Sequence, residues 1–272
     1  MTLRRLWIAT IAAYALQPFA GMARAQEASL VSVNTARGAK QAFILIKPEK
    51  PTASVVLFAG GLGKLGLKSG TTMAWGRLNF LVRVREQFAA QGFMVAVVDA
   101  PSDRAQQGMP GSFRMTPGHA RDIGAVADYL KKQANIPVWL VGTSLGTFSS
   151  ANGASALKNV DGLVLTSTIT RTQPKWPIRR THPDAVASMR LSAVTVPALI
   201  VSHKDDGCAV TPAADGQKLA RRLSKSRKVE VATVEGGKPP ENDDPCEAMT
   251  QHGFLGIEDQ VVARIAAFIK AN

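Results

Sequence analysis

A serine stands between two glycines in the segment Gly142-Thr143-Ser144-Leu145-Gly146. The short apolar run at residues 138–141 predicts a buried strand, and the small and apolar residues after the segment predict a helix. Glycine tolerates the sharp turn that joins such a strand to such a helix, so Ser144 is lifted above the end of the sheet. A serine hydroxyl held there can act as a nucleophile when a base and an orienting acid support it.

Four histidines are candidates for the base: His119, His182, His203 and His252. His252 follows the last predicted strand, in a loop before the closing helix, from which it can point across the edge of the sheet. His119 begins a predicted helix, where capping or burial explains it, and His203 directly follows a buried strand beside carboxylates. Nothing in the sequence positions His182. We therefore predict that His252 is the general base.

The acid is sought where parallel strands end, because functional groups collect at the carboxyl ends of the strands of such sheets. The predicted strand at residues 198–202 is followed closely by Asp205 and Asp206, whereas the preceding strand ends without a carboxylate. We predict that Asp206, nearer the turn, orients the histidine. Asp205 is the alternative acid. A third possibility is that both aspartates belong to an ordinary surface turn without a catalytic role.

The chain has two cysteines, Cys208 and Cys246. In an oxidising compartment two cysteines predict one disulfide. In the chain-entropy model the bridge would stabilise the fold by about 3–4 kcal/mol, and it would tie the loop of Asp206 to the loop of His252. No CxxC motif or Cys/His cluster is present, so we expect neither a metal nor another cofactor.

Backbone amides are the expected donors to a negatively charged tetrahedral intermediate. Leu145 N–H follows the serine directly, and the glycine-rich loop Gly60-Gly61-Leu62-Gly63 follows another predicted strand. Such a loop could instead cradle phosphate, but it lacks the Lys-Ser/Thr of a P-loop and the spacing of a dinucleotide site. We predict Leu145 N–H and Gly61 N–H as the donors, with Leu62 N–H as the alternative to Gly61.

Strands and helices alternate along the chain, which predicts an α/β fold with a mostly parallel sheet covered by helices on both faces. Eight strands are expected, the first two forming an antiparallel hairpin, at residues 30–35, 41–47, 54–59, 93–98, 138–141, 162–166, 198–202 and 229–234. Helices are expected at residues 79–91, 117–134, 145–157, 212–223 and 256–270.

Only residues 167–196 are long enough to cover a site, and they predict a short flap, with a short helix at residues 184–191, rather than a large cap domain. Trp176, Met189 and Phe148 are candidates for an acyl pocket, although core packing explains them equally well. The arginines of the flap are either solvated or attract an anionic substrate.

The start of the chain has the pattern of a secretory signal peptide, with Arg4 and Arg5, an apolar stretch and the cleavage signal Ala23-Arg24-Ala25. We predict a signal peptide at residues 1–25, the alternative being an uncleaved anchor, and a single exported domain at residues 26–272. The mature protein would then be periplasmic or secreted, without stable membrane insertion.

The formal net charge of the whole chain is +13. The basic residues are spread along the chain and few aromatic residues accompany them. A nucleic-acid partner is therefore not expected, and a solvated basic surface is the interpretation that we favour.

The order Ser144, Asp206, His252, with G-x-S-x-G between a strand and a helix, resembles the α/β-hydrolase superfamily over residues 30–272, especially its compact dienelactone-hydrolase-like and serine-peptidase-like members. The resemblance implies a serine hydrolase that cleaves an ester, or less readily an amide, through an acyl-enzyme without a cofactor. Its substrate would be a small-molecule or envelope-derived acyl compound. Two alternatives are an acyltransferase acting on an envelope acceptor and a non-catalytic binding protein of this fold. The oligomeric state stays open.

Overall fold

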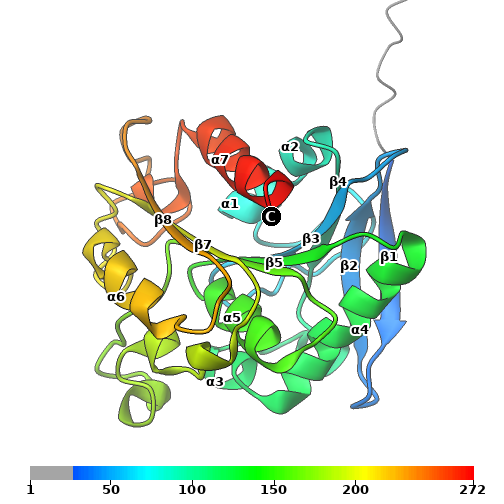
Figure 1. Ribbon diagram of the computed structural model, residues 1–272, viewed down its shortest axis with the longest axis horizontal. Helices are drawn as coiled ribbons and strands as arrows, with labels where there is room; N and C mark the ends of the chain where they lie inside the picture. The colour runs from blue at the N-terminus through cyan, green and yellow to red at the C-terminus, as the bar shows by residue number, and fades with distance from the viewer. Residues whose placement is uncertain (1–26) are drawn as a thin grey trace, which may run out of the picture.

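The computed structural model describes residues 27–272, so the predicted signal peptide lies outside the described residues. Eight strands form one sheet in the order β1-β2-β4-β3-β5-β6-β7-β8 (Figure 1). Strand β2 pairs antiparallel with β1 and β4, and all other pairs are parallel. The strands are β1 (Ala28–Asn34), β2 (Lys40–Ile46), β3 (Ala53–Phe58), β4 (Phe93–Val98), β5 (Val138–Thr143), β6 (Gly162–Thr166), β7 (Ala198–His203) and β8 (Val229–Val234). The predicted eight-stranded, mostly parallel sheet is confirmed.

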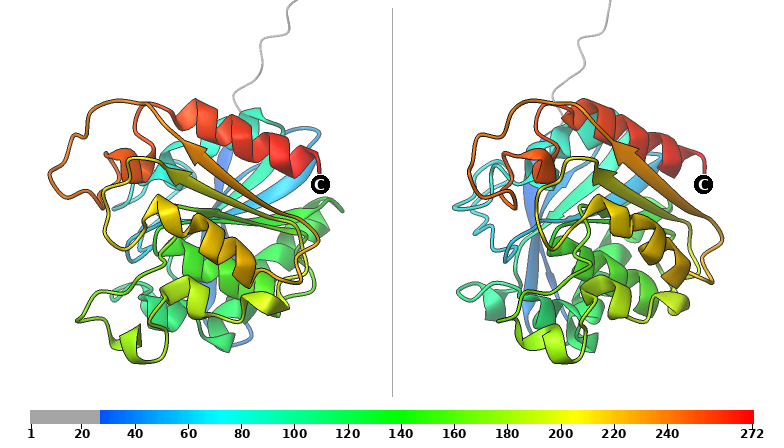
Figure 2. Two further views of the ribbon diagram at one scale, coloured as in Figure 1. Left: turned by 60° about the vertical axis from the view of Figure 1, so that its left-hand side comes forward. Right: turned by 90° about the vertical axis from the view of Figure 1, so that its left-hand side faces the viewer.

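Helices cover both faces of this sheet (Figures 1 and 2). One face carries α1 (Phe80–Arg83), α2 (Arg85–Ala90) and α7 (Glu258–Lys270). The other face carries α3 (Gly111–Arg114), α4 (Pro117–Gln133), α5 (Gly146–Ala156) and α6 (Gly216–Arg222). Within residues 27–272, none of these helices is both long enough and apolar enough to cross a membrane.

The two faces of the sheet have separate hydrophobic cores. Alternate side chains of a strand point to opposite faces, and in β3 Val55 and Leu57 join the core under α7, whereas Val56 and Phe58 join the core under α4 and α5. Every residue of β3 to β7 is buried. These central strands therefore form a rigid base for the loops at their carboxyl ends.

The expected helix at residues 79–91 is divided into α1 and α2 at Val84, whose φ of −96° and ψ of 6° interrupt the helix. Phe80, Val82, Val84 and Phe88 all lie in the same core. The two short helices, one on each side of the interruption, therefore both pack against this core.

The flap at residues 167–196 contains three 3₁₀ turns and no α-helix. The turns are η2 (Pro177–Arg180), η3 (Ala185–Ser188) and η4 (Leu191–Ala193). The helix expected at residues 184–191 is therefore wrong. Ala185, Val186 and Leu191 are buried against the core, so the segment packs down on the α5 side of the sheet.

Candidate active site

Ser144 lies in the turn between β5 and α5 with a φ of +50°, a left-handed conformation that is unusual for serine. Close packing enforces this turn, because a Cβ on Gly146 would overlap the carbonyl of Phe58 and a Cβ on Gly142 would overlap the backbone of Gly146. Ser144 N–H donates to Thr166 O at 3.1 Å. Both glycines are therefore required for the approach of α5 to the sheet, and the serine stands at the end of β5.

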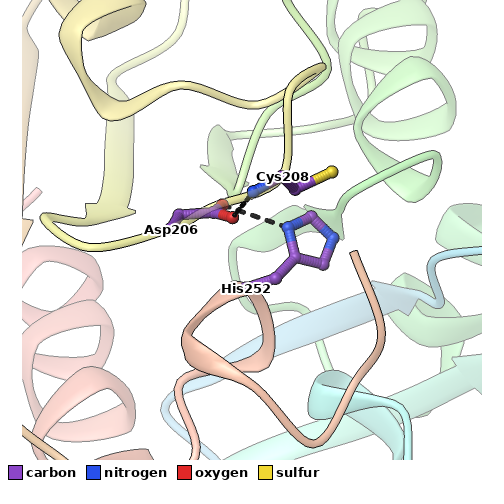
Figure 3. A group of neighbouring side chains, drawn as sticks. All are labelled: Asp206, Cys208 and His252. Carbon is purple, nitrogen blue, oxygen red and sulfur yellow. Dashed lines mark hydrogen bonds and ion pairs between the residues drawn. The ribbon is translucent and has the colours of Figure 1, made fainter. Parts of the chain in front are cut away.

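Asp206 and His252 form a hydrogen-bonded pair, with 3.0 Å between His252 Nδ1 and Asp206 Oδ2 (Figure 3). The Asp206 side chain is wholly buried and that of His252 is 5% exposed. Asp206 Oδ1 accepts from Cys208 N–H at 3.0 Å, and Oδ2 also accepts from Thr211 Oγ1 at 2.9 Å. Both oxygens of the carboxylate are thus held in place, with Oδ2 facing the imidazole nitrogen.

The second imidazole nitrogen, His252 Nε2, is buried and has no hydrogen-bond partner within the described residues. In Figure 3 this edge of the ring points away from Asp206. His252 and Ser144 both line a cavity of about 760 Å³. No hydrogen bond joins Ser144 Oγ to His252 Nε2 in the part of the chain that the structure describes.

The backbone of His252 is held by two hydroxyl groups that the sequence analysis did not identify. Ser167 Oγ donates to His252 O at 2.7 Å, and Ser167 itself has a φ of +42°. His252 N–H donates to Thr250 Oγ1 at 3.1 Å. The only sequence signal for Ser167 is its place at the end of a buried strand, where polar residues tend to serve the site.

A disulfide joins Cys208 to Cys246. Cys208 lies beside Asp206 and His252, and their potential ligand atoms fall within 4.8 Å of one another. Because the sulfur of Cys208 is bonded to Cys246, it cannot supply a thiolate to a metal. The chemistry of the group therefore fits an orienting acid and a base better than a metal centre.

The glycine-rich loop after β3 faces the serine. A Cβ on Gly60 would lie 3.0 Å from Ser144 Cβ, so only glycine allows this approach without displacement. Gly61 has a φ of +56° and its amide, like those of Leu62 and Leu145, donates no hydrogen bond within the described chain. All three amides are thus available to an oxyanion, and the choice between Gly61 and Leu62 stays open.

Arg114 supports this loop from the interior of the protein. Its wholly buried guanidinium donates to Ala59 O at 3.1 Å, to Gly61 O at 3.2 Å and to Met109 O at 2.8 Å. Burial lowers its pKa. No sequence signal distinguishes Arg114 among the 33 lysines and arginines of the chain.

The other candidates for base and acid lie elsewhere. His119 is buried against Ser149 Oγ at 2.9 Å on the α5 side of the sheet. The ring of His203 contacts Gly236 O through Nε2 and accepts the Asp205 N–H at Nδ1. The Asp205 side chain is exposed and does not contact His252, and His182 contacts only Thr181 through its ring.

The residues that line the cavity are not those that the sequence suggested for an acyl pocket. Phe148 and Met189 are buried in the core and Trp176 packs against it, so none of them lines the cavity. The wall consists instead of the segments 59–65, 73–80, 143–144, 246–248 and 252–253. The long loop between β8 and α7, orange in Figure 2, brings the last two segments to the site.

Strand order, the turn at the serine and the position of the acid–base pair together define an α/β-hydrolase fold. A family model described as serine aminopeptidase, S33, matches residues 76–235, which is more than half of the chain. The protein therefore belongs to this family of α/β hydrolases. No curated protein sequence matches it significantly.

Solved structures share the fold at low sequence identity. An esterase of Pyrococcus furiosus is 15% identical with a TM-score of 0.64, covering 90% of this chain and 91% of the other. A dienelactone hydrolase of Anabaena variabilis is 15% identical with a TM-score of 0.62 over 91% and 99% of the two chains. The α/β hydrolase GrgF of a Penicillium species is 11% identical with a TM-score of 0.63 over 90% and 98%.

Removing the disulfide tests how far it stabilises the fold and the acid–base pair. The double variant Cys208→Ala/Cys246→Ala should lose about 2–4 kcal/mol of unfolding free energy in urea, because its unfolded chain regains the freedom of the open loop. A reducing agent should lower the stability of the wild-type protein and leave that of the variant unchanged. Equal stability of the two proteins would show that the bridge contributes nothing.

A second prediction concerns His119, whose pKa is lowered to about 3 by burial and by the charges of Arg114 and Arg37. The unfolded chain takes up a proton below about pH 6.5, whereas the folded protein does not until about pH 3. Unfolding free energy should therefore fall as the pH drops through this window, by about 2 kcal/mol at pH 5. In His119→Gln this part of the pH dependence should disappear from urea titrations at pH 7.5, 6 and 5, and an unchanged slope would contradict the assignment.

Proposed function

We propose that the protein is a serine hydrolase that cleaves carboxylic esters through an acyl-enzyme on Ser144. The observation that carries this proposal is the buried pair of His252 and Asp206: His252 lines the same cavity as Ser144, and its Nε2 has no hydrogen-bond partner within the described residues. An imidazole oriented by a carboxylate at one nitrogen and unoccupied at the other is what a general base requires. Membership of a hydrolase family and the fold shared with esterases support the same reaction class.

In the acylation step, Ser144 Oγ attacks the ester carbonyl and His252 Nε2 takes the hydroxyl proton. The carbonyl oxygen becomes an oxyanion, stabilised by Leu145 N–H and by Gly61 or Leu62 N–H. The tetrahedral intermediate then collapses, the bond to the alcohol breaks, and His252 returns its proton to the leaving oxygen. Asp206 stays ionised and stabilises the imidazolium.

In the deacylation step, a water molecule enters the open cavity and attacks the acyl carbonyl. His252 takes a proton from this water, the bond to Ser144 Oγ breaks, and the proton passes to the serine. The products are a carboxylic acid and the regenerated hydroxyl. These steps use only side chains and amides of this chain.

We also propose that the protein acts outside the cytoplasm, as a periplasmic or secreted enzyme. A disulfide between Cys208 and Cys246 supports this location, since disulfides persist in oxidising compartments. The signal-peptide pattern at residues 1–25 supports it independently.

Replacing the nucleophile tests the proposal directly. Ser144→Ala should lower kcat for p-nitrophenyl esters by about 10⁴-fold or more and abolish labelling by a fluorophosphonate probe. Ser155→Ala, on the helix α5 that follows the serine turn and outside the cavity, is the matched control and should behave like wild type. Wild-type rates in the Ser144 variant, or no labelling of the wild-type protein, would refute the mechanism.

Two neighbouring aspartates allow a sharper test of the acid. Asp206→Asn should lower kcat by about 10⁴-fold, because an amide cannot hold the imidazole in the required tautomer or stabilise its charge. Asp205→Asn changes an exposed carboxylate without contact to His252 and should retain activity. Equal losses in the two variants, with both proteins folded by circular dichroism, would exclude the assignment of Asp206.

A further inference from the structure

The exposed apolar side chains of the protein gather at the candidate site. Within residues 27–272, four large hydrophobic side chains are strongly exposed: Leu30, Leu62, Trp75 and Leu78. Three of them line the cavity of Ser144 and His252. These are Leu62, Trp75 and Leu78, whose exposures are 49%, 62% and 57% respectively. Single exposed apolar residues are common, but a group of them around one cavity marks a binding surface.

The segment that carries these side chains is held in place by the interior. The buried carboxylate of Asp99 accepts the amides of Leu65 at 2.7 Å, Gly66 at 3.2 Å and Leu67 at 2.9 Å. Trp75 N–H in turn donates to Leu65 O at 2.9 Å. The backbone of Trp75 is therefore held to the segment that Asp99 fixes.

Charged groups on the same wall have both signs. Lys64 Nζ donates to Gln106 O at 3.0 Å and lies 6.0 Å from the centre of the Trp75 ring. Arg77 and Glu247 are exposed on the wall as well. Because cations and a carboxylate both line the cavity, these charges do not favour one sign of charge on the substrate. The apolar side chains are therefore the feature that distinguishes one ester from another.

We propose that Leu62, Trp75 and Leu78 form a subsite for an apolar chain or ring of the substrate. The inference rests on the proposed function and names its substrate class, esters with an apolar group of several carbons beside the scissile carbonyl. A cavity of about 760 Å³ is far larger than an acetyl group needs and lies within the range of drug-sized ligands. The apolar group belongs either to the acid or to the alcohol, and the experiment separates the two.

Two ester series measure the preference, each below the concentration at which the ester forms micelles. p-Nitrophenyl esters from acetate to octanoate vary the acid, and acetates from methyl to octyl vary the alcohol. In one series kcat/KM should rise about twofold with each methylene, because the half-open wall removes only part of the chain from water. A flat profile in both series, from an enzyme that is active on short esters, would overturn the subsite.

Variants locate the preference on the wall. Trp75→Ser and Leu78→Ser should keep kcat/KM for short esters within about twofold of the wild-type value. For the eight-carbon ester of the series that shows the preference, kcat/KM should fall about tenfold. Leu30→Ser, the matched control on β1, replaces the remaining exposed leucine, which does not line the cavity, and should change neither rate. A chain-length profile that persists in both cavity variants would place the apolar contact elsewhere and refute the proposal.

A binding measurement keeps the subsite testable if catalysis itself is absent. Methyl octanoate, octyl acetate and methyl acetate are titrated into Ser144→Ala, with isothermal titration calorimetry as the readout. One of the two eight-carbon esters should bind at least tenfold more tightly than methyl acetate, and this difference should vanish in Ser144→Ala/Trp75→Ser. Equal binding of all three esters refutes the subsite, whereas preferential binding without esterase activity or fluorophosphonate labelling of the wild-type protein supports the subsite and refutes the proposed function.

Discussion

The left-handed backbone at Ser144 is the constraint on which the rest of the site depends. A non-glycine residue in this conformation costs about 1–2 kcal/mol, and here it persists because α5 approaches β3 and β5 so closely that Gly142 and Gly146 have no room for a Cβ. The strain is therefore carried by the packed core under α5. Any residue that moved this helix outward would relax the turn and withdraw the hydroxyl from the cavity.

Arg114 shapes the glycine-rich loop that faces Ser144, although burial of its charge costs free energy. A cation that is wholly buried without a carboxylate partner must satisfy its donors on neutral acceptors, and Arg114 does so on Ala59 O, Gly61 O, Met109 O and Ser149 Oγ. A hydrogen bond to a peptide carbonyl polarises that peptide unit and strengthens its N–H as a donor. The Gly61 carbonyl shares its peptide group with Leu62 N–H, so the guanidinium polarises that amide, while the choice between Gly61 and Leu62 as the proposed donor stays open.

Sequence patterns predicted the sheet well because its central strands are short apolar runs that are buried on both faces. They did not predict the interruption at Val84 or the 3₁₀ turns of the flap, which follow from packing between segments. Arg114 and Ser167 escaped notice for the same reason, since their partners Ala59 and His252 are 55 and 85 residues away along the chain. The cavity wall at residues 64–78 was missed because this segment has no helical or strand periodicity, whereas the flap drew attention by its length.

The proposed nucleophile and the proposed base are held by different physical means. Ser144 directly follows β5, a strand whose burial fixes the backbone, whereas His252 lies on residues 235–257, a loop whose short helical turn η6 (Gln251–Gly253) is its only helix or strand. Residues 235–249 of this loop are exposed or half-buried and would open at little cost in free energy, whereas Phe254 anchors the end of the loop in the core. The bond between Cys208 and Cys246 and the hydroxyl of Ser167 fasten the loop to the ends of β7 and β6. The imidazole is thus positioned by two links to the sheet and by one buried aromatic side chain, which explains how a mostly exposed loop can hold a buried histidine at the cavity.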